Sequence, residues 1–379
     1  MIVPPFSNDI SRPLVCDKQQ VKGRSSNLEL YRIICMLMIV AHHYVVNSGL
    51  NYPNGPLVTN PDTANSIFLQ LFGMWGKTGI NCFMMITGYF MCIIKITLKK
   101  FLKLLLQIYF YKFLLFPVFL FTGYETLSFG RVVTLLMPFW GINNDFVGCF
   151  IIFYLTIPFL SILVQNMNKR QHQLLLLLAI CCYTLLGSVP GFRISFNYIT
   201  WFCIIFFIAS YVRLYPSAVF QRKALWGSLT LISTVLAMTS VFLLQKLFLS
   251  GYYFMEDSNK FFAVVVAVCS FLWFKNMKIK QSRIINVVGG SSFGVLLIHT
   301  NSNAMRTWLW KDTVDCVGHY SMSFGGLVMY TIGAVLVVFV VCNVIDQLRV
   351  HLVEKPFFKW YDLKIDQKMQ YALNRVLNA

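Results

Sequence analysis

Long apolar runs separated by short polar segments occupy most of the chain. A helix needs roughly 20 mostly apolar residues to cross the hydrocarbon core of a bilayer, and the runs here are of that length. They predict ten membrane-spanning helices, near residues 28–50, 72–94, 101–122, 146–165, 172–189, 197–215, 224–249, 260–275, 290–310 and 325–350. Residues 131–140 could form a further short or re-entrant segment. We therefore expect an all-α polytopic membrane protein with about ten transmembrane helices.

The ten helices are expected to form a single membrane domain, residues 28–355, between two short ends. Residues 1–27 are polar, contain three prolines and lack the apolar core of a signal peptide, so the first helix is expected to act as an uncleaved anchor. Residues 356–379 are expected to form a cytoplasmic tail with a surface helix. No internal repeat or low-complexity tract interrupts this organisation.

The formal net charge of +18 would suggest a nucleic-acid partner in a soluble domain, but its distribution favours another explanation. With the N-terminus inside, 23 of the 32 Lys and Arg residues fall in cytoplasmic segments and 5 in external ones. This asymmetry satisfies the positive-inside rule, so both termini are predicted to be cytoplasmic and no nucleic-acid partner is expected. The remaining four basic residues lie inside the predicted spans: Arg32, Lys77, Lys112 and Arg306.

Composition excludes a soluble protein and gives no support for a metal site. Hydrophobic residues make up 57% of the chain, and 35 of its residues are Phe. The eleven cysteines are scattered mostly through apolar segments, with no CxxC pair and no Cys/His cluster. The sequence therefore predicts neither a metal site nor a disulfide framework.

The first predicted helix carries Glu29, Arg32 and His43 in an apolar segment. Eleven residues make three helical turns to within about 20°, so Arg32 and His43 share one face and lie about 16 Å apart along the axis. Glu29 lies close to that face, whereas His42 falls well off it. Ionisable groups inside a bilayer usually face a bundle interior or a water-filled cavity. Glu29 and Arg32 could be a local pair at the interface. The deeper His43 favours a base or ligand, with a neutral, carbonyl-bonded histidine as the alternative.

The second and ninth predicted helices also carry polar residues at helical spacing. Lys77 and Asn81 are i,i+4 neighbours in a glycine-rich segment, where a lysine near the external end could simply extend to the surface. His299, Asn303 and Arg306 lie at i, i+4 and i+7 and form one polar face of an apolar helix. Packing alone does not account for a second histidine and an arginine on one such face.

The third predicted helix enters the membrane with Lys99, Lys100 and Lys103, followed at i,i+4 spacing by Gln107 and Tyr111. Cations on one face could hold phosphates, although a basic cytoplasmic loop explains them equally well.

The last predicted helix carries Asp346 and Arg349 near its cytoplasmic end. Their i,i+3 spacing predicts an interface ion pair.

In this order, these residues resemble acyltransferase family 3, the multi-pass bacterial acyltransferases that modify surface sugars. The resemblance runs from about residue 24 to residue 358 and is closest to the branch that acts on cell-envelope or capsular polysaccharides. Its elements are Arg32 and His43 with ten residues between them, Thr-Gly-Tyr-Phe at 87–90, Lys100 with Lys103, Ser-Phe-Gly-Val-Leu-Leu-Ile-His at 292–299, and Glu-Lys-Pro-Phe at 354–357. Here Lys replaces the family's Arg on the third helix, which keeps the charge without the bidentate fork.

The resemblance implies a membrane O-acyltransferase in the bacterial cytoplasmic (inner) membrane. It would move an acetyl or other small acyl group from cytoplasmic acetyl-CoA to a hydroxyl of a sugar or polysaccharide precursor outside. The implied catalytic residues are His43 as base, Arg32 and Glu29. The implied phosphate-binding residues are Lys99, Lys100, Lys103 and Arg32, and the implied acceptor-side residues are Lys77, Asn81, His299, Asn303 and Arg306. Direct transfer and a covalent acyl-histidine relay both remain open.

Two other functions fit the same buried charges. A transporter or flippase for an anionic lipid-linked sugar would use them as its pathway, although such proteins often show internal repeats and broken helices. A relative that binds acyl-CoA without turnover is the other alternative.

Overall fold

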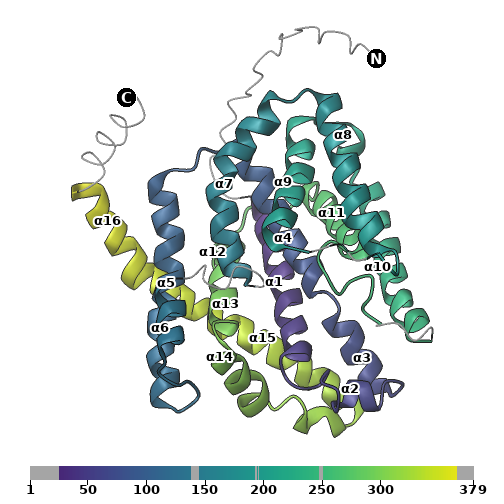
Figure 1. The fold of residues 1–379 in the computed structure, drawn as a ribbon, viewed down its shortest axis with the longest axis vertical. Helices are drawn as coiled ribbons and strands as arrows, with labels where there is room; N and C mark the ends of the chain where they lie inside the picture. Colours follow the sequence, from purple (N-terminus) through teal and green to yellow (C-terminus); the bar gives the residue numbers. More distant parts are fainter. Residues whose placement is uncertain (1–24, 138–144, 193, 195, 247–250, 365–379) are drawn as a thin grey trace.

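The computed structural model describes residues 25–137, 145–192, 194, 196–246 and 251–364. Within these residues the protein is built from helices, with no strand, as the sequence predicts (Figure 1). Most of the predicted N-terminal segment and residues 365–379 of the predicted tail lie outside the described residues. The helices are α1 (Ser26–Val46), α2 (Pro56–Thr59), α3 (Ala64–Gly73), α4 (Gly76–Met91), α5 (Leu98–Phe121), α6 (Phe129–Leu136), α7 (Phe146–Asn166), α8 (Lys169–Ala179), η1 (Ile180–Leu185), η2 (Leu186–Ser188), α9 (Tyr198–Leu214), η3 (Val219–Gln221), α10 (Lys223–Lys246), α11 (Phe261–Lys275), α12 (Arg283–Gly290), α13 (Ser292–His299), α14 (Asn303–Thr307), η4 (Trp308–Thr313), η5 (Gly318–Ser321), α15 (Phe324–Arg349), η6 (Val350–Glu354) and α16 (Lys355–Lys364).

Helix α1 lies at the centre of the bundle. It lies among α3, α4, α11, α12, α13 and α15 and contacts all six (Figure 1). Half of its residues are buried. It runs without a break through both Arg32 and His43, so the predicted separation of about 16 Å along its axis follows from its geometry. It ends at Val46, four residues before the end of the predicted span.

Helix α4 packs closely on both α1 and α9 because small residues face its neighbours. A Cβ on Gly79 would lie 2.9 Å from the Cys35 carbonyl oxygen of α1. A Cβ on Gly88 would lie 2.9 Å from the Ala209 Cβ of α9. Small residues let helix backbones approach in this way inside membranes, where burial of apolar surface gives little driving force between helices.

The number of spanning helices is lower than the ten predicted. Among the described residues, six helical segments are long and apolar enough to cross a bilayer, or seven if the bent pair Arg283–His299 and Asn303–Ser321 is one span. Tyr198–Leu214 and Phe261–Lys275 are apolar but shorter, and α4 has only 16 residues. The apolar run predicted at 290–310 bends by 97° after His299. An apolar run therefore contains a helix in each case, but not always one continuous helix of spanning length.

Helices α5 and α6 lie at one edge of the bundle, with α16 nearby (Figure 1). Helix α5 packs mainly on α13 and η6, and it exposes large apolar side chains such as Phe113, Leu114 and Phe121. Apolar surface on this scale marks a protein that contacts lipid. The short helix α6 covers the first part of the predicted segment 131–140, whose last residues lie outside the described residues. A helix is present where one was predicted after Pro356: α16 follows η6 directly.

Candidate active site

Two histidines from α1 and α13 form a hydrogen-bonded pair. His43 Nδ1 lies 2.9 Å from His299 Nε2, and His299 Nδ1 lies 2.6 Å from the Val295 carbonyl oxygen. A carbonyl oxygen can only accept, so His299 carries its proton on Nδ1, and in the neutral ring Nε2 is the acceptor. His43 must then donate from Nδ1. This leaves Nε2 of His43 as an unprotonated nitrogen that can accept a proton from another group.

The His43 side chain lines a cavity of about 430 Å³, a volume typical of small-molecule sites. Residues from α1, α4, α5, α6, α7, α9, α13 and α14, and from the bend between α13 and α14, form its wall. The first residues of three helices, α4, α7 and α9, lie in the wall; side chains cap the starts of α7 and α9, whereas no side chain caps α4. The arrangement places a base beside a polar space inside an apolar bundle.

Three basic side chains share this cavity wall: Lys77, Lys112 and Arg306. Lys77 Nζ donates to the Tyr198 hydroxyl at 2.9 Å, and Lys112 Nζ donates to the Thr134 carbonyl oxygen at 3.0 Å. Arg306 and Lys77 are both near enough to His43 to interact with it electrostatically. The cavity therefore carries positive charge close to the histidine pair.

His42 also lines the cavity, although sequence reasoning placed it off the functional face. Its Nδ1 donates to the Gly73 carbonyl oxygen at 2.6 Å. A Cβ on Gly76 would lie 2.2 Å from the His42 ring, so this ring packs directly on the start of α4. The cavity curves around α1, and residues about 100° apart on that helix can therefore both reach it.

Glu29 and Arg32 form an ion pair one turn apart on α1, with Arg32 Nη1 3.1 Å from Glu29 Oε1. The Glu29 side chain is buried, and Arg32 is one-quarter exposed. Among the described residues, the set that lines the cavity includes neither of them. Arg32 is thus positioned as predicted on α1, but away from the space beside His43.

A buried ionic network holds the helix that carries His299. The Asp346 carboxylate of α15, 1% exposed, accepts hydrogen bonds from Gln107, Tyr111 and Arg349 through Oδ1. A Cβ on Gly294 of α13 would lie only 2.2 Å from the Asp346 Cγ, so α13 packs directly on this carboxylate. The predicted pair of Asp346 and Arg349 is present, but it lies in the core rather than at an exposed interface.

A family model described as an acyltransferase domain matches residues 25–343, which is most of the chain. The chain belongs to acyltransferase family 3. The matched range contains the histidine pair and every described residue that lines the cavity. It ends before the Glu-Lys-Pro-Phe element at 354–357. No curated protein and no solved structure was found to match the chain. The family match and the several helices of spanning length together identify this protein as a multi-pass membrane acyltransferase.

The lysines predicted to bind phosphates in this acyltransferase are largely engaged by protein groups. Lys99 Nζ lies 2.5 Å from an Asp362 carboxylate oxygen, and Lys103 Nζ lies 2.5 Å from Glu354 Oε1. Lys100 Nζ donates to the Lys95 carbonyl oxygen at 2.9 Å. A phosphate would have to compete with a carboxylate at Lys99 and Lys103. Lys100 differs from Lys99 and Lys103: within the described chain, its hydrogen bond is to a neutral carbonyl oxygen, which does not compensate its charge.

Two residues predicted on the acceptor side of the acyltransferase lie elsewhere. Asn81 is fully buried: its amide donates to the Ser258 and Ala263 carbonyl oxygens and accepts from Trp201 Nε1 at 2.8 Å. Asn303 is exposed and accepts from Arg306 Nη1 at 3.1 Å. Within the described part of the chain, neither residue lines the cavity. Asn81 joins α4, α9 and α11, which is a structural role.

Sequence reasoning gave no role to several cavity residues, above all Lys112, Asp145 and Tyr198. A lysine in the middle of the apolar run 101–122 is unusual, and that signal could have identified Lys112. Asp145 and Tyr198 stand at helix starts, where polar and aromatic residues are common. Whether they line a cavity depends on which helix ends lie together in the fold, which the sequence does not indicate.

Proposed function

We propose that this protein is a membrane O-acyltransferase that moves an acetyl or other small acyl group from acyl-CoA to a hydroxyl of a sugar or polysaccharide precursor. The observation that carries the proposal is the hydrogen-bonded pair of His43 and His299 at the wall of the cavity. It leaves Nε2 of His43 free to accept a proton in a space large enough for a sugar. The family and the resemblance described above support the same reaction class.

In the proposed reaction, His43 Nε2 takes the proton of the acceptor hydroxyl as its oxygen attacks the thioester carbonyl carbon. The new ester bond forms, the carbon–sulfur bond breaks, and His43 returns the proton to the departing sulfur. Holding both substrates against one base converts an encounter between separate molecules into a reaction within one complex. A covalent acyl-His43 intermediate is the alternative route, and rapid acid quenching followed by mass analysis of the protein would detect it.

His299 is proposed as the positioning residue for His43. When His43 gains a proton on Nε2, its Nδ1–H still donates to His299 Nε2, and this bond strengthens because the donor is now charged. The Val295 carbonyl fixes the proton of His299 on the opposite nitrogen. His299 thus selects the tautomer of His43 that can act as a base and stabilises its protonated form.

Lys77 is proposed to stabilise the negative charge that develops on the thioester carbonyl oxygen. It stands at the start of α4, where no side chain caps the helix, and it interacts electrostatically with both His42 and His43. A cation and an uncapped helix N-terminus both favour negative charge at this point. Removing one such donor from an acyl-transfer site typically lowers the rate about 100-fold or more.

The donor is proposed to enter from the cytoplasmic side of a bacterial inner membrane, in line with the charge asymmetry of the loops. Lys100 is the best candidate to contact its phosphates, because Lys99 and Lys103 already face carboxylates. Arg32 would then guide the arm of the donor towards His43 along α1, with Glu29 holding its guanidinium.

The test is turnover of acyl-labelled acetyl-CoA by the purified protein in lipid nanodiscs, measured as slow CoA release and as transfer to added sugars. We expect His43→Ala to lower both rates about 1,000-fold, within the range of general-base catalysis. His351→Ala is the matched control, since this histidine is exposed and lies on η6, away from the cavity. Near-normal turnover by folded His43→Ala would contradict the proposed base.

The same experiment separates the alternative functions. Binding of acetyl-CoA without any turnover would indicate a silent relative. No acetyl-CoA binding, combined with movement of a lipid-linked sugar across the bilayer, would indicate a transporter.

A further inference from the structure

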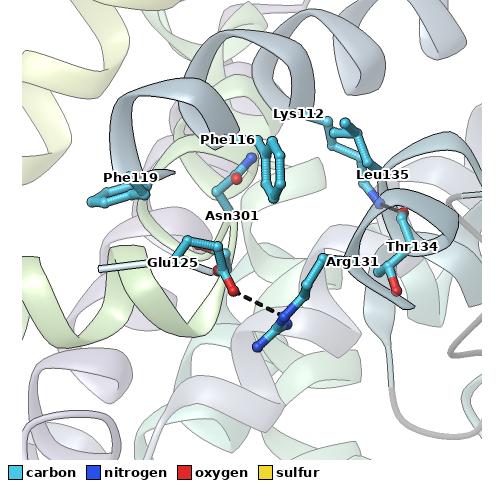
Figure 2. Close-up of a pocket in the computed structure, with 9 residues that line it drawn as sticks. Lys112, Phe116, Phe119, Glu125, Arg131, Thr134, Leu135 and Asn301 are labelled. Atoms are coloured by element: carbon cyan, nitrogen blue, oxygen red, sulfur yellow. Dashed lines mark hydrogen bonds and ion pairs between the residues drawn. The ribbon is translucent and has the colours of Figure 1, made fainter. Parts of the chain in front are cut away.

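A second, smaller cavity of about 70 Å³ adjoins the one beside His43 (Figure 2). Lys112, Thr134 and Asn301 line both, so the two spaces share a wall formed by α5, α6 and the bend after α13. Phe116 and Phe119 supply apolar faces to the smaller space. Aromatic faces beside polar side chains suit a sugar ring, which has apolar and polar surfaces. The two cavities together extend from the base towards the edge of the bundle.

Positive charge in the larger cavity is not balanced by the protein. Against Lys77, Lys112 and Arg306 the wall contains one carboxylate, Asp145, which interacts electrostatically with both Lys112 and Arg306. That carboxylate caps α7, where it accepts hydrogen bonds from the Val147 and Gly148 N–H groups, so its charge is shared with the helix N-terminus. Within the described residues, none of the three cations takes part in an ion pair. The excess is two positive charges while the histidines are neutral.

Arg306 also has an unsatisfied donor. Its Nη1 donates to Asn303, but its buried Nε has no hydrogen-bond partner in the part of the chain that is described. A guanidinium donor buried without a partner is unfavourable, because it loses its hydration without a replacement. An anion in the cavity would supply both the missing acceptor and the missing negative charge.

The neighbouring cavity provides a contrast within the same structure. There Arg131 Nε lies 2.8 Å from Glu125 Oε1, and the Glu125 side chain is buried, so this cation is already neutralised (Figure 2). In the smaller cavity, a carboxylate of the protein itself therefore compensates the charge of the arginine. Among the described cations that line the two cavities, the three without an ion pair are Lys77, Lys112 and Arg306, and all three line the space that contains His43.

The anion that fits this position is a group on the acceptor, not on the donor. In an acyl-CoA the whole pantetheine arm separates the phosphates from the thioester, so a donor whose thioester reaches His43 has its phosphates elsewhere. Lys112 lines both cavities, and Arg306 interacts electrostatically with His43 and His299. An acidic group held between these two cations would leave a neighbouring hydroxyl of the same sugar close to the base.

We propose that the acceptor is an acidic sugar, whose carboxylate or phosphate is bound by Lys112 and Arg306 while its hydroxyl faces His43. The inference rests on the proposed acyl transfer for the role of His43, but the anion site itself rests only on the cavity and its charges. Carboxylate and phosphate share the chemistry that the two cations recognise. The experiment below distinguishes them.

The test measures the binding of simple probes to the purified protein in nanodiscs, by titration of thermal stability without any donor present. The probes are methyl glucuronide, glucose 6-phosphate, and methyl glucoside as the neutral match. We expect at least one acidic probe to bind about tenfold or more tightly than the glucoside, and this preference to weaken as salt is raised. The acidic probe that binds better identifies the anionic group.

Variants then locate the site. Lys112→Gln and Arg306→Gln should each weaken binding of the acidic probe about tenfold or more and leave glucoside binding little changed. Lys311→Gln is the matched control: it removes a cation of the same region that packs on the Tyr52 ring and lies outside both lining sets. It should keep the preference. If a variant does not fold, the salt dependence of acidic-probe binding by the unmodified protein still tests the charge argument.

Three outcomes would overturn the inference. They are equal binding of acidic and neutral probes, a preference that survives both substitutions, and displacement of the acidic probe by free CoA, which would assign the site to the donor. The result is independent of turnover. Acidic preference in a protein that does not use acetyl-CoA would refute the proposed function alone, whereas acetyl transfer without acidic preference would refute this inference alone.

Discussion

The contact between Gly294 of α13 and Asp346 of α15 allows a sharp test of how the site is held. A Cβ added at Gly294 would lie 2.2 Å from both Cγ and Oδ1 of Asp346. Carbon atoms pack at about 3.5–4.0 Å, so Gly294→Ala requires a shift of at least about 1 Å. Asp346 resists this shift, because its Oδ1 accepts three hydrogen bonds from residues on α5 and α15. The displacement is therefore expected to fall largely on α13.

His299 lies five residues further along the same short helix, so it should move with α13. A displacement of about 1 Å would stretch the 2.9 Å bond to His43, and misplacement on this scale lowers the rate about 100-fold. Overpacking destabilises the fold by about 1–3 kcal/mol, offset in part by the higher helix propensity of Ala, worth about 0.5–1 kcal/mol. We therefore expect a large loss of turnover with a loss of stability of at most about 2.5 kcal/mol.

Gly333→Ala is the control, since it makes the same substitution within α15 at a position where an added Cβ meets nothing within 4 Å. Turnover of labelled acetyl-CoA and thermal unfolding in nanodiscs should be measured for both variants. Gly333→Ala should retain full turnover. If Gly294→Ala behaves like Gly333→Ala in both assays, the reasoning that Asp346 positions the helix of His299 is wrong.

Three further predictions follow from individual side-chain contacts. Asn81→Ala should lower stability by about 3 kcal/mol, because it leaves several buried hydrogen-bond partners unpaired. The folded fraction should keep its kcat. A lower kcat at unchanged stability would instead indicate that Asn81 belongs to the acceptor site. Glu354→Gln should destabilise the fold by about 3 kcal/mol, because it removes the carboxylate that lies between Lys103 and the buried Arg349. An unchanged melting temperature would contradict this prediction. Lys99→Ala should change stability by less than about 1 kcal/mol, because its ion pair with Asp362 is exposed. The KM for acetyl-CoA should not change, because Lys99 already faces a carboxylate. Equal increases in KM for Lys99→Ala and Lys100→Ala would instead show that both lysines bind phosphate.

The sequence was sufficient to identify the helical class and to single out His43, Lys77 and Arg306, which the structure brings to one cavity. The spacing of Arg32 and His43 correctly placed both on one helix. The single polar face predicted for His299, Asn303 and Arg306 is wrong, because the chain bends by 97° after His299 and the other two residues lie on α14. Such inferences rest on the fact that ionisable residues in apolar segments are unfavourable without a reason. They do not depend on knowing which helices are neighbours.

Pairing between distant segments could not be predicted in the same way. The contact between His43 and His299 joins residues 256 positions apart, and the pair of Lys99 with Asp362 joins residues 263 positions apart. A lysine that is free to bind phosphate and one that is neutralised by a carboxylate look identical in a sequence. For this reason the lysines of the third helix were assigned to phosphate, whereas two of them face acidic residues near the C-terminal end of the described chain.

The shortfall in spanning helices and the position of the cavity have a common cause. Helices α4 and α9 are shorter than a bilayer requires, and both begin at the cavity, as Lys77 and Tyr198 in its wall show. Helix α13 ends there, with Thr300 in the wall just before the chain bends by 97°. Helix ends carry unpaired backbone groups, which are tolerated among apolar helices only where they are buried in protein or line a polar space. The same helix ends that make the apolar runs too short to span therefore lie at the cavity that His43 lines. A broken apolar run that carries a cation is the sequence feature most worth testing for a role in catalysis.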